Sequence, residues 1–184
     1  MGTAYSAELT SFEATPQVMA DSGSAGGKVR VWSDTIAAGT GDIDDDDIIM
    51  MAEIPSNAKI KSIMLYNDDL DSNGSPTLKT DVGIYNGNVK FNDTDSSATA
   101  YAAEGVIDRD CYGTLMTTLQ AANTAGVEVR YETLGIETVG NYMWEDAGLT
   151  SDPGRNLRIA LTIETVAATA AAGDITMVVE YVIN

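Results

Sequence analysis

The sequence LRIALTIE (residues 157–164) alternates large apolar residues with polar or small ones, with a period of two. The same alternation returns in ITMVVEYVI (residues 175–183), after the small-residue stretch 167–173. Successive side chains of a β-strand point to opposite faces, so this period predicts two strands that each bury one face. Two such strands joined by a loop of small residues predict a C-terminal hairpin.

Outward from this pair, the rest of the chain repeats the pattern. Alternating or short apolar runs bounded by turn formers predict strands over residues 28–36, 47–53, 59–67, 78–84 and 127–131. Asn86-Gly87 followed by VKF (residues 89–91) predicts a tight hairpin, because both central residues of such a turn take positive φ.

A single helix is expected between these strands. Within residues 108–122, Cys111, Leu115 and Leu119 recur at helical spacing, although Gly113 weakens the prediction. About eight strands with one short helix, and no regular alternation of strands and helices, predict an all-β chain. The expected fold is an antiparallel β-sandwich, jelly-roll-like, with an extended N-terminal arm.

The length of 184 residues suits one folded body, so we predict two regions: an N-terminal arm (residues 1–27) and a sandwich domain (residues 28–184). The arm has scattered apolar residues without a clean period and ends in the linker-like DSGSAGG of residues 21–27. Apolar residues in a segment without its own core are candidates for partner binding. They are Tyr5, Leu9, Phe12, Val18 and Met19.

The composition excludes several function classes. With 28 Asp and Glu against 10 Lys and Arg, the net charge is −18, which disfavours nucleic acid and anionic membrane surfaces as partners. The absence of His excludes His-based catalysis and His-ligated metals, and the single Cys111 excludes an internal disulfide and multi-Cys metal sites. No apolar stretch predicts a transmembrane helix and no signal peptide is predicted, so synthesis in the cytoplasm is expected.

Two acidic segments are candidate cation sites. Residues 42–47 (DIDDDD) carry five carboxylates; we predict a solvated loop, and a cation site or a contact with a basic partner is the alternative. Residues 69–74 (DLDSNG) match the first half of a calcium loop, but Thr80 stands where a bidentate Glu belongs. A polar loop is therefore predicted there too, and no metal or other cofactor is assigned.

No catalytic residue is assigned. Cys111 occupies a core-facing position without a His partner, so it is interpreted as a buried small residue and not as a nucleophile. A hydrolase using two carboxylates is conceivable for any acidic chain, but 28 acids make pairing uninformative. The expectation is a protein that is not an enzyme.

Several short phrases together resemble a known class of proteins. They are residues 8–16, 28–37, 54–60, 65–71, 78–87 and 158–165. The most specific are DDLD (residues 68–71) and DVGIY (residues 81–85). The pattern is similar to that of small virion structural proteins of tailed bacteriophages, of the capsid decoration or cement type.

The resemblance implies an assembly role. The chain would bind the outside of the capsid shell and stabilise it, with the major capsid protein as partner and the virion surface as location. It also implies a symmetric homo-oligomer, a trimer at three-fold or quasi-three-fold positions. The −18 charge agrees with an outer surface, because packaged DNA would repel an acidic protein inside the shell.

A second hypothesis is a carbohydrate-binding β-sandwich module of a phage fibre or adhesin, assisted by calcium. Exposed aromatic side chains gathered on one face would favour this hypothesis. The candidates are Trp32, Tyr66, Tyr85, Tyr101 and Trp144.

Overall fold

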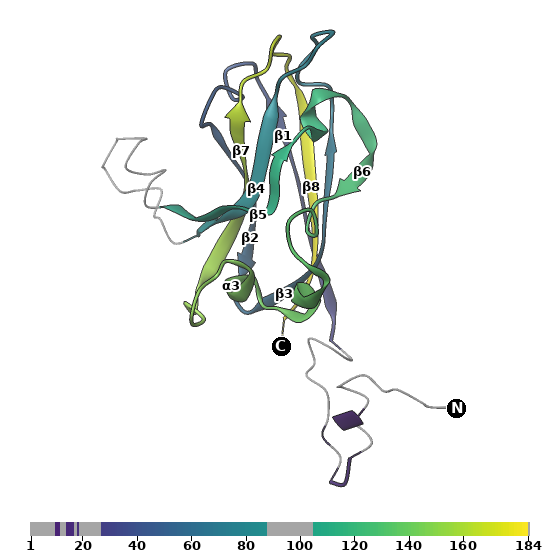
Figure 1. The fold of residues 1–184 in the computed structure, drawn as a ribbon, viewed down its shortest axis with the longest axis vertical. Coiled ribbons are helices and arrows are strands. Elements are labelled where there is room, and N and C mark those ends of the chain that lie inside the picture. Colours follow the sequence, from purple (N-terminus) through teal and green to yellow (C-terminus); the bar gives the residue numbers. More distant parts are fainter. Residues whose placement is uncertain (1–9, 12–13, 17, 19–26, 88–104, 184) are drawn as a thin grey trace.

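The computed structural model describes residues 10–11, 14–16, 18, 27–87 and 105–183. Its described strands form two four-stranded antiparallel sheets packed face to face (Figure 1). The first sheet has the order β1 (Val29–Ala38), β8 (Gly173–Ile183), β3 (Ala58–Asn67), β6 (Asn123–Glu128). The second has the order β2 (Ile48–Pro55), β7 (Asn156–Thr165), β4 (Lys79–Asn86), β5 (Val106–Met116).

This strand order confirms the predicted all-β sandwich. Except for β4 and β5, consecutive strands lie in opposite sheets, and the last two strands occupy the second place in each sheet. That is the connectivity of a jelly roll. Short elements close one end of the sandwich between β6 and β7: the 3-10 helix η2 (Ile136–Gly140) and α3 (Met143–Asp146) (Figure 1).

The two alternating C-terminal runs fill the core as predicted. The apolar residues of β7 that face β8 across the sandwich are fully buried, and so are Ile175, Met177 and Val179 of β8. Val82 and Ile84 of β4 are also 0% exposed. Burial of one large apolar side chain stabilises the folded state by roughly 1.5–3 kcal/mol. The buried side chains of these strands are therefore the main stabilising contribution to the fold.

The predicted C-terminal hairpin is wrong, although both of its strands exist. β7 pairs with β2 and β4, whereas β8 pairs with β1 and β3 in the opposite sheet. The connecting residues 166–172 are long enough to cross between the sheets, and Asp71 bridges to Ala170 on the way. Alternation fixes which face of a strand is apolar, but it does not fix the neighbouring strand.

The alternation in residues 28–36 also predicts that Val29 and Val31 face the core, and this prediction is wrong. Val29 and Val31 are 59% and 58% exposed, whereas Ile36 and Ala38 on the opposite face of β1 reach the core. The indole Nε1 of Trp32 donates a hydrogen bond to the carbonyl oxygen of Met51 on β2, 3.1 Å away. The reason is register: pairing with β8 sets Val31 beside Glu180, which faces solvent. An edge strand takes its faces from its neighbour.

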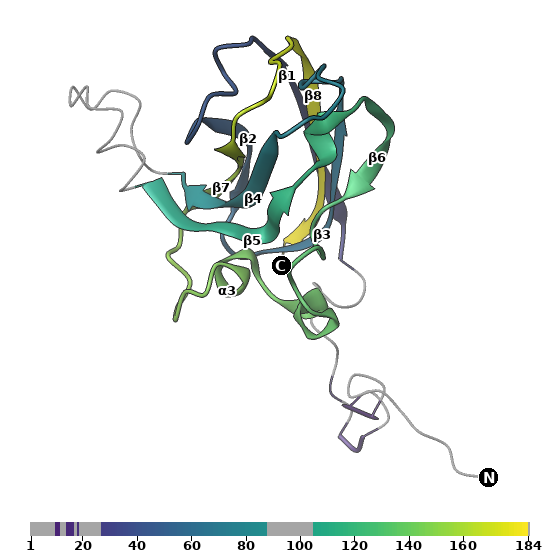
Figure 2. The same ribbon diagram turned by 45° about the horizontal axis from the view of Figure 1, so that its top comes forward.

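The α-helix predicted over residues 108–122 does not form. The segment is strand β5 followed by the 3-10 helix η1 (Thr118–Gln120). β5 pairs with β4 through several register shifts and bends strongly as it runs (Figure 2). Cys111 and its neighbour Tyr112 are both buried, while Leu115 is exposed, so the helical spacing was coincidental. Tertiary pairing with β4 outweighs the local propensity.

Three smaller differences remain. β6 spans Asn123–Glu128, so it begins earlier than the strand predicted at residues 127–131 and overlaps only the first two of those residues. Within residues 106–183 the one α-helix is α3, in a segment whose sequence has no clear period. The second half of the hairpin predicted at Asn86-Gly87, residues 89–91, lies outside the described residues. Both edges of β4 are occupied by β5 and β7.

Candidate assembly surface

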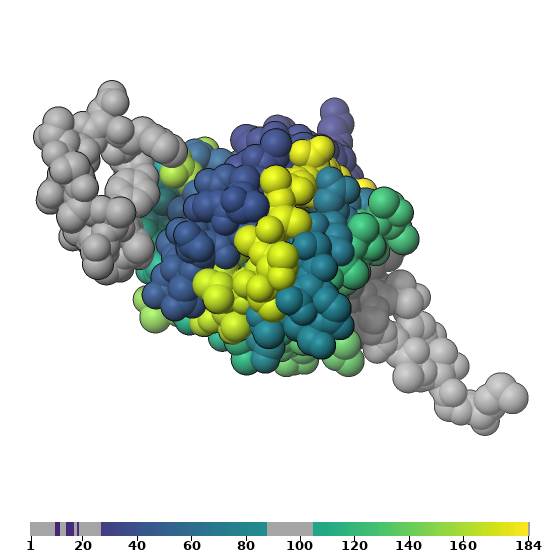
Figure 3. Space-filling view, turned by 90° about the horizontal axis from the view of Figure 1, so that it is seen from above, coloured from purple at the N-terminus to yellow at the C-terminus, as the bar shows by residue number. Residues whose placement is uncertain are grey.

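Asp71 joins two loops at one end of the sandwich. Its buried carboxylate accepts hydrogen bonds within its own loop from the backbone N–H groups of Thr77 and Leu78, at 2.6 and 3.0 Å. It accepts two more from the β7–β8 loop, from Ala168 and Thr169, at 3.0 and 2.9 Å. Seen from above, these loops lie side by side (Figure 3).

This geometry explains the calcium-like sequence at residues 69–74. Burial raises the pKa of Asp71, but the four backbone donors outweigh it and hold the pKa well below its usual range. Asp69 accepts a hydrogen bond from the Asp71 N–H, and the Asn73 side-chain oxygen accepts one from the Ser75 N–H. Asp71 therefore holds the two loops together, while Asp69 and the Asn73 side-chain oxygen order turns within their own loop.

The acidic residues 42–47 form the β1–β2 loop. Asp42 accepts a hydrogen bond from the Gly39 N–H and Asp47 accepts one from the Asp44 N–H, both at 2.8 Å. Ile43 is buried and anchors the loop to the core. Nowhere in the described residues do three or more acidic or Cys side chains gather in a way that could hold a metal ion.

We predict that exchanging Asp44 and Asp45 together for Asn changes the free energy of unfolding by no more than about 0.5 kcal/mol per site. Both side chains are exposed, and relief of mutual repulsion offsets any lost contact. Urea unfolding with and without a chelator measures this. A chelator that destabilises the wild type but not the double variant would assign the loop to cation binding.

A second cluster surrounds Arg109 of β5. Its guanidinium forms an ion pair with Glu164, and lies 3.7 Å from the Asp81 carboxylate and 3.8 Å from that of Asp46. Burial and neighbouring carboxylates raise the pKa of Glu164. The other Asp81 oxygen accepts a hydrogen bond from the Leu115 N–H at 2.7 Å. We call these five residues the Leu115 surface.

The Leu115 surface could not be predicted from the sequence. Treating residues 108–122 as a helix turned Leu115 toward the core and gave Arg109 no partner. The sequence signal that was available is the β-branched and aromatic content of the segment, which favours a strand.

A buried ion pair holds the opposite end of the sandwich. The Arg130 and Asp146 side chains are both 0% exposed and lie 2.8 Å apart. Arg130 Nε also donates to the carbonyl oxygen of Ile60 on β3, at 2.8 Å. Tyr112 of β5 donates to Asp146 at 3.4 Å. This network ties α3 to both sheets.

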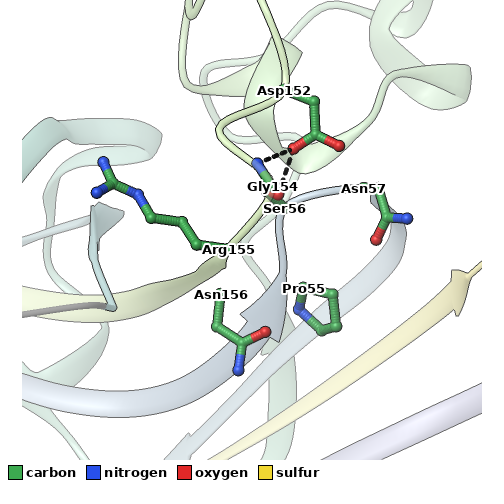
Figure 4. A pocket seen from close by; sticks show the side chains of 7 residues that line it. All are labelled: Pro55, Ser56, Asn57, Asp152, Gly154, Arg155 and Asn156. Atoms are coloured by element: carbon green, nitrogen blue, oxygen red, sulfur yellow. Dashed lines mark hydrogen bonds between the residues drawn. The ribbon is translucent and has the colours of Figure 1, made fainter.

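A surface hollow lies where the β2–β3 turn meets the residues leading into β7 (Figure 4). It has a volume of about 200 Å³ and a polar lining. Asp152 accepts hydrogen bonds there from the Ser56 hydroxyl and the Gly154 N–H, so its carboxylate orders the turn.

Cys111 is a buried free cysteine on β5. Burial raises the pKa of its thiol, which leaves the thiol un-ionised.

The fold is shared with bacteriophage capsid chains. A chain in the capsid of Ralstonia phage GP4 superposes with a TM-score of 0.63 at 23% identity, covering 86% of both chains. A chain in the cyanophage Pam1 capsid asymmetric unit gives 0.57 at 21% identity, covering 100% of both. At these identities the likeness is one of fold. No protein-family model and no curated protein matches the chain.

Of the predicted partner-binding residues, only one is among those described. Val18 is 56% exposed. Tyr5, Leu9, Phe12 and Met19 lie outside the described residues, so their role and the division at residue 27 stay predictions. No helix in the part of the chain that the structure describes is long and apolar enough to cross a membrane.

The aromatic side chains do not share one face. Tyr85 is 1% exposed and hydrogen-bonds to the Thr162 hydroxyl. Trp32 lies on β1 at one edge of the first sheet and pairs with the buried Val179, whereas the half-buried Tyr66 of β3 pairs with Thr176 on the opposite face of β8. Trp144 belongs to α3 and stacks with Tyr142 at the closed end. Tyr101 lies outside the described residues. The arrangement that would favour a carbohydrate-binding module is therefore not present among the described aromatics.

Proposed function

We propose that this chain is a non-enzymatic structural protein of a bacteriophage virion, which binds the outside of the capsid shell and stabilises it. The observation that carries the proposal is the fold likeness to chains of two phage capsids over 86% and 100% of the chain. The short sequence phrases that resemble those of decoration proteins independently support the same proposal of a structural role in the virion.

The charge supports placement on the outer surface. A net charge of −18 opposes contact with packaged DNA and keeps particles apart in solution. A protein that binds the assembled shell, and not its separate subunits, stabilises the shell by mass action. We propose the major capsid protein as the partner, with the chain itself forming a homotrimer.

The experiment that tests this proposal begins with the protein composition of intact virions. We expect the chain in a fixed copy number relative to the major capsid protein. Shells that lack the chain should then bind it in sedimentation assays and melt at a higher temperature once saturated. A chain that is absent from virions, or that leaves shell melting unchanged, would contradict the proposal.

Removal of residues 1–27 tests the predicted arm. We expect the melting temperature of the free protein to change by no more than about 3 °C, because β1 begins only at Val29. Binding to shells should weaken at least about tenfold, which corresponds to about 1.4 kcal/mol of contact by the arm. A truncated protein that binds shells as tightly as the full chain would remove the arm from the mechanism.

A further inference from the structure

Leu115 combines two unfavourable features that the fold itself does not need. Its side chain is 51% exposed, and its backbone φ is +48°, in the left-handed region. A bulky residue at positive φ is strained, and Gly or Asn would relieve the strain. An exposed Leu also gains little from burial in its own chain. Strain that persists at an exposed apolar residue points to a functional role.

The strained conformation is held by a buried group. Asp81 is 3% exposed, and one of its oxygens accepts the hydrogen bond from the Leu115 N–H at 2.7 Å. The other oxygen faces the Arg109 side chain, with Nε 3.7 Å away. Arg109 is in turn ion-paired to Glu164. These polar contacts hold the Leu115 backbone in place, and the Leu115 side chain projects into solvent.

The charge around Leu115 selects the kind of partner. Three carboxylates, of Asp46, Asp81 and Glu164, surround the single guanidinium of Arg109, so the Leu115 surface has a net negative charge. The Asp46 side chain is 81% exposed and carries this charge into the acidic β1–β2 loop, where Asp44 and Asp45 are also exposed. Complementarity requires a partner whose basic side chains border an apolar recess.

We propose that the Leu115 surface is the sandwich's own contact with the capsid shell, with Leu115 inserted into an apolar recess rimmed by Lys or Arg side chains. This inference rests on the proposed function and names the face of the domain that performs it. A few residues that fill desolvated pockets near the centre of an interface, ringed by contacts that exclude water, carry most of the binding free energy.

The test compares shell binding by three full-length variants. Leu115→Asn introduces a residue that tolerates positive φ and removes the apolar side chain. We expect shell binding to weaken at least about tenfold while the melting temperature stays equal or rises. Leu115→Met should retain most of the affinity. Ile136→Asn makes a comparable change at a residue that is 90% exposed on η2, and should bind as the wild type does.

Each outcome decides between hypotheses. If the wild type binds shells and Leu115→Asn binds them equally well, the inference is wrong and the proposed function stands. If the wild type does not bind shells, the proposed function fails and the inference fails with it. If Leu115→Asn loses self-association in sedimentation equilibrium but keeps its affinity for shells, the surface contacts a second copy and the inference is again wrong.

Discussion

Replacing Arg130 with Met is expected to destabilise the protein by about 3–5 kcal/mol, the usual effect of removing one partner from a buried ion pair. Met occupies similar volume, so the loss comes from the Asp146 carboxylate, which stays buried without its counter-charge. The hydrogen bond from Arg130 to the Ile60 carbonyl is lost as well. The midpoint of urea unfolding at pH 7 measures the change.

A double variant separates the lost pair from lost packing. Arg130→Met combined with Asp146→Leu removes both charges, and should recover at least about half of the lost stability, because an apolar pair of similar volume often replaces a buried ion pair without loss. A single Arg130→Met variant within about 1 kcal/mol of the wild type would show that the network contributes little.

The pH dependence of Arg130→Met provides an independent measurement. Burial raises the pKa of Asp146 to about 6 even though Arg130 lowers it, and loss of Arg130 raises it further. When the pKa of a carboxyl group is raised in the folded state, a fall in pH protonates that group in the folded state at a higher pH than in the unfolded state. The variant should therefore gain stability relative to the wild type as the pH falls from 7 to 5.

Replacing Asp71 with Ala is expected to cost about 3–4 kcal/mol. The carboxylate accepts four backbone hydrogen bonds, two from its own loop and two from the β7–β8 loop. Its removal leaves these donors without an acceptor in a buried site, and both loops lose their common anchor. Thermal and urea unfolding measure the loss. Asp69→Ala is the matched control, because that exposed carboxylate holds a single backbone N–H, and should cost no more than about 1 kcal/mol.

The pH dependence of stability tests the Asp71 carboxylate separately from the packing that the Ala substitution also removes. The folded pKa of Asp71 lies below its unfolded value, so its contribution to stability is full above about pH 4 and is lost as the pH falls toward the folded pKa. Asp71→Ala should therefore show a flatter decline of stability below pH 4 than the wild type. Parallel declines would mean that the carboxylate does not contribute as its geometry indicates.

The sequence was informative where burial and alternation act together. In β7 and β8 alternate apolar side chains reach one continuous core, so a period of two gave both the strand and its buried face; these residues are Leu157, Ile159, Leu161, Ile163, Ile175, Met177 and Val179. In β1 the same period gave the strand but not the face, because pairing with β8 turned Val29 and Val31 outward. Which strands pair depends on contacts far apart in the sequence, and the C-terminal hairpin was wrong for that reason.

The candidate site was less accessible to sequence reasoning. Arg109, Asp81, Glu164 and Asp46 come from four separate segments, and only pairing among β4, β5 and β7 brings them together. Among 28 acidic residues, nothing in the sequence marks Asp71 as the one buried between two loops. A residue's chemical type is visible in a sequence, whereas its burial and donors follow from tertiary structure.

The strand order of the two sheets also constrains how the chain is made. β8 lies between β1 and β3, and β7 lies between β2 and β4, yet these two strands follow all the other described strands in the chain. Neither sheet can form its central pairings while the ribosome is still translating residues 150–180. Until then, the edges of β1, β2, β3 and β4 that later pair with β7 or β8 are unpaired. Unpaired strand edges and pairings between distant segments favour slow folding and aggregation. Folding is therefore expected to be cooperative and to be completed only after β8 has been synthesised.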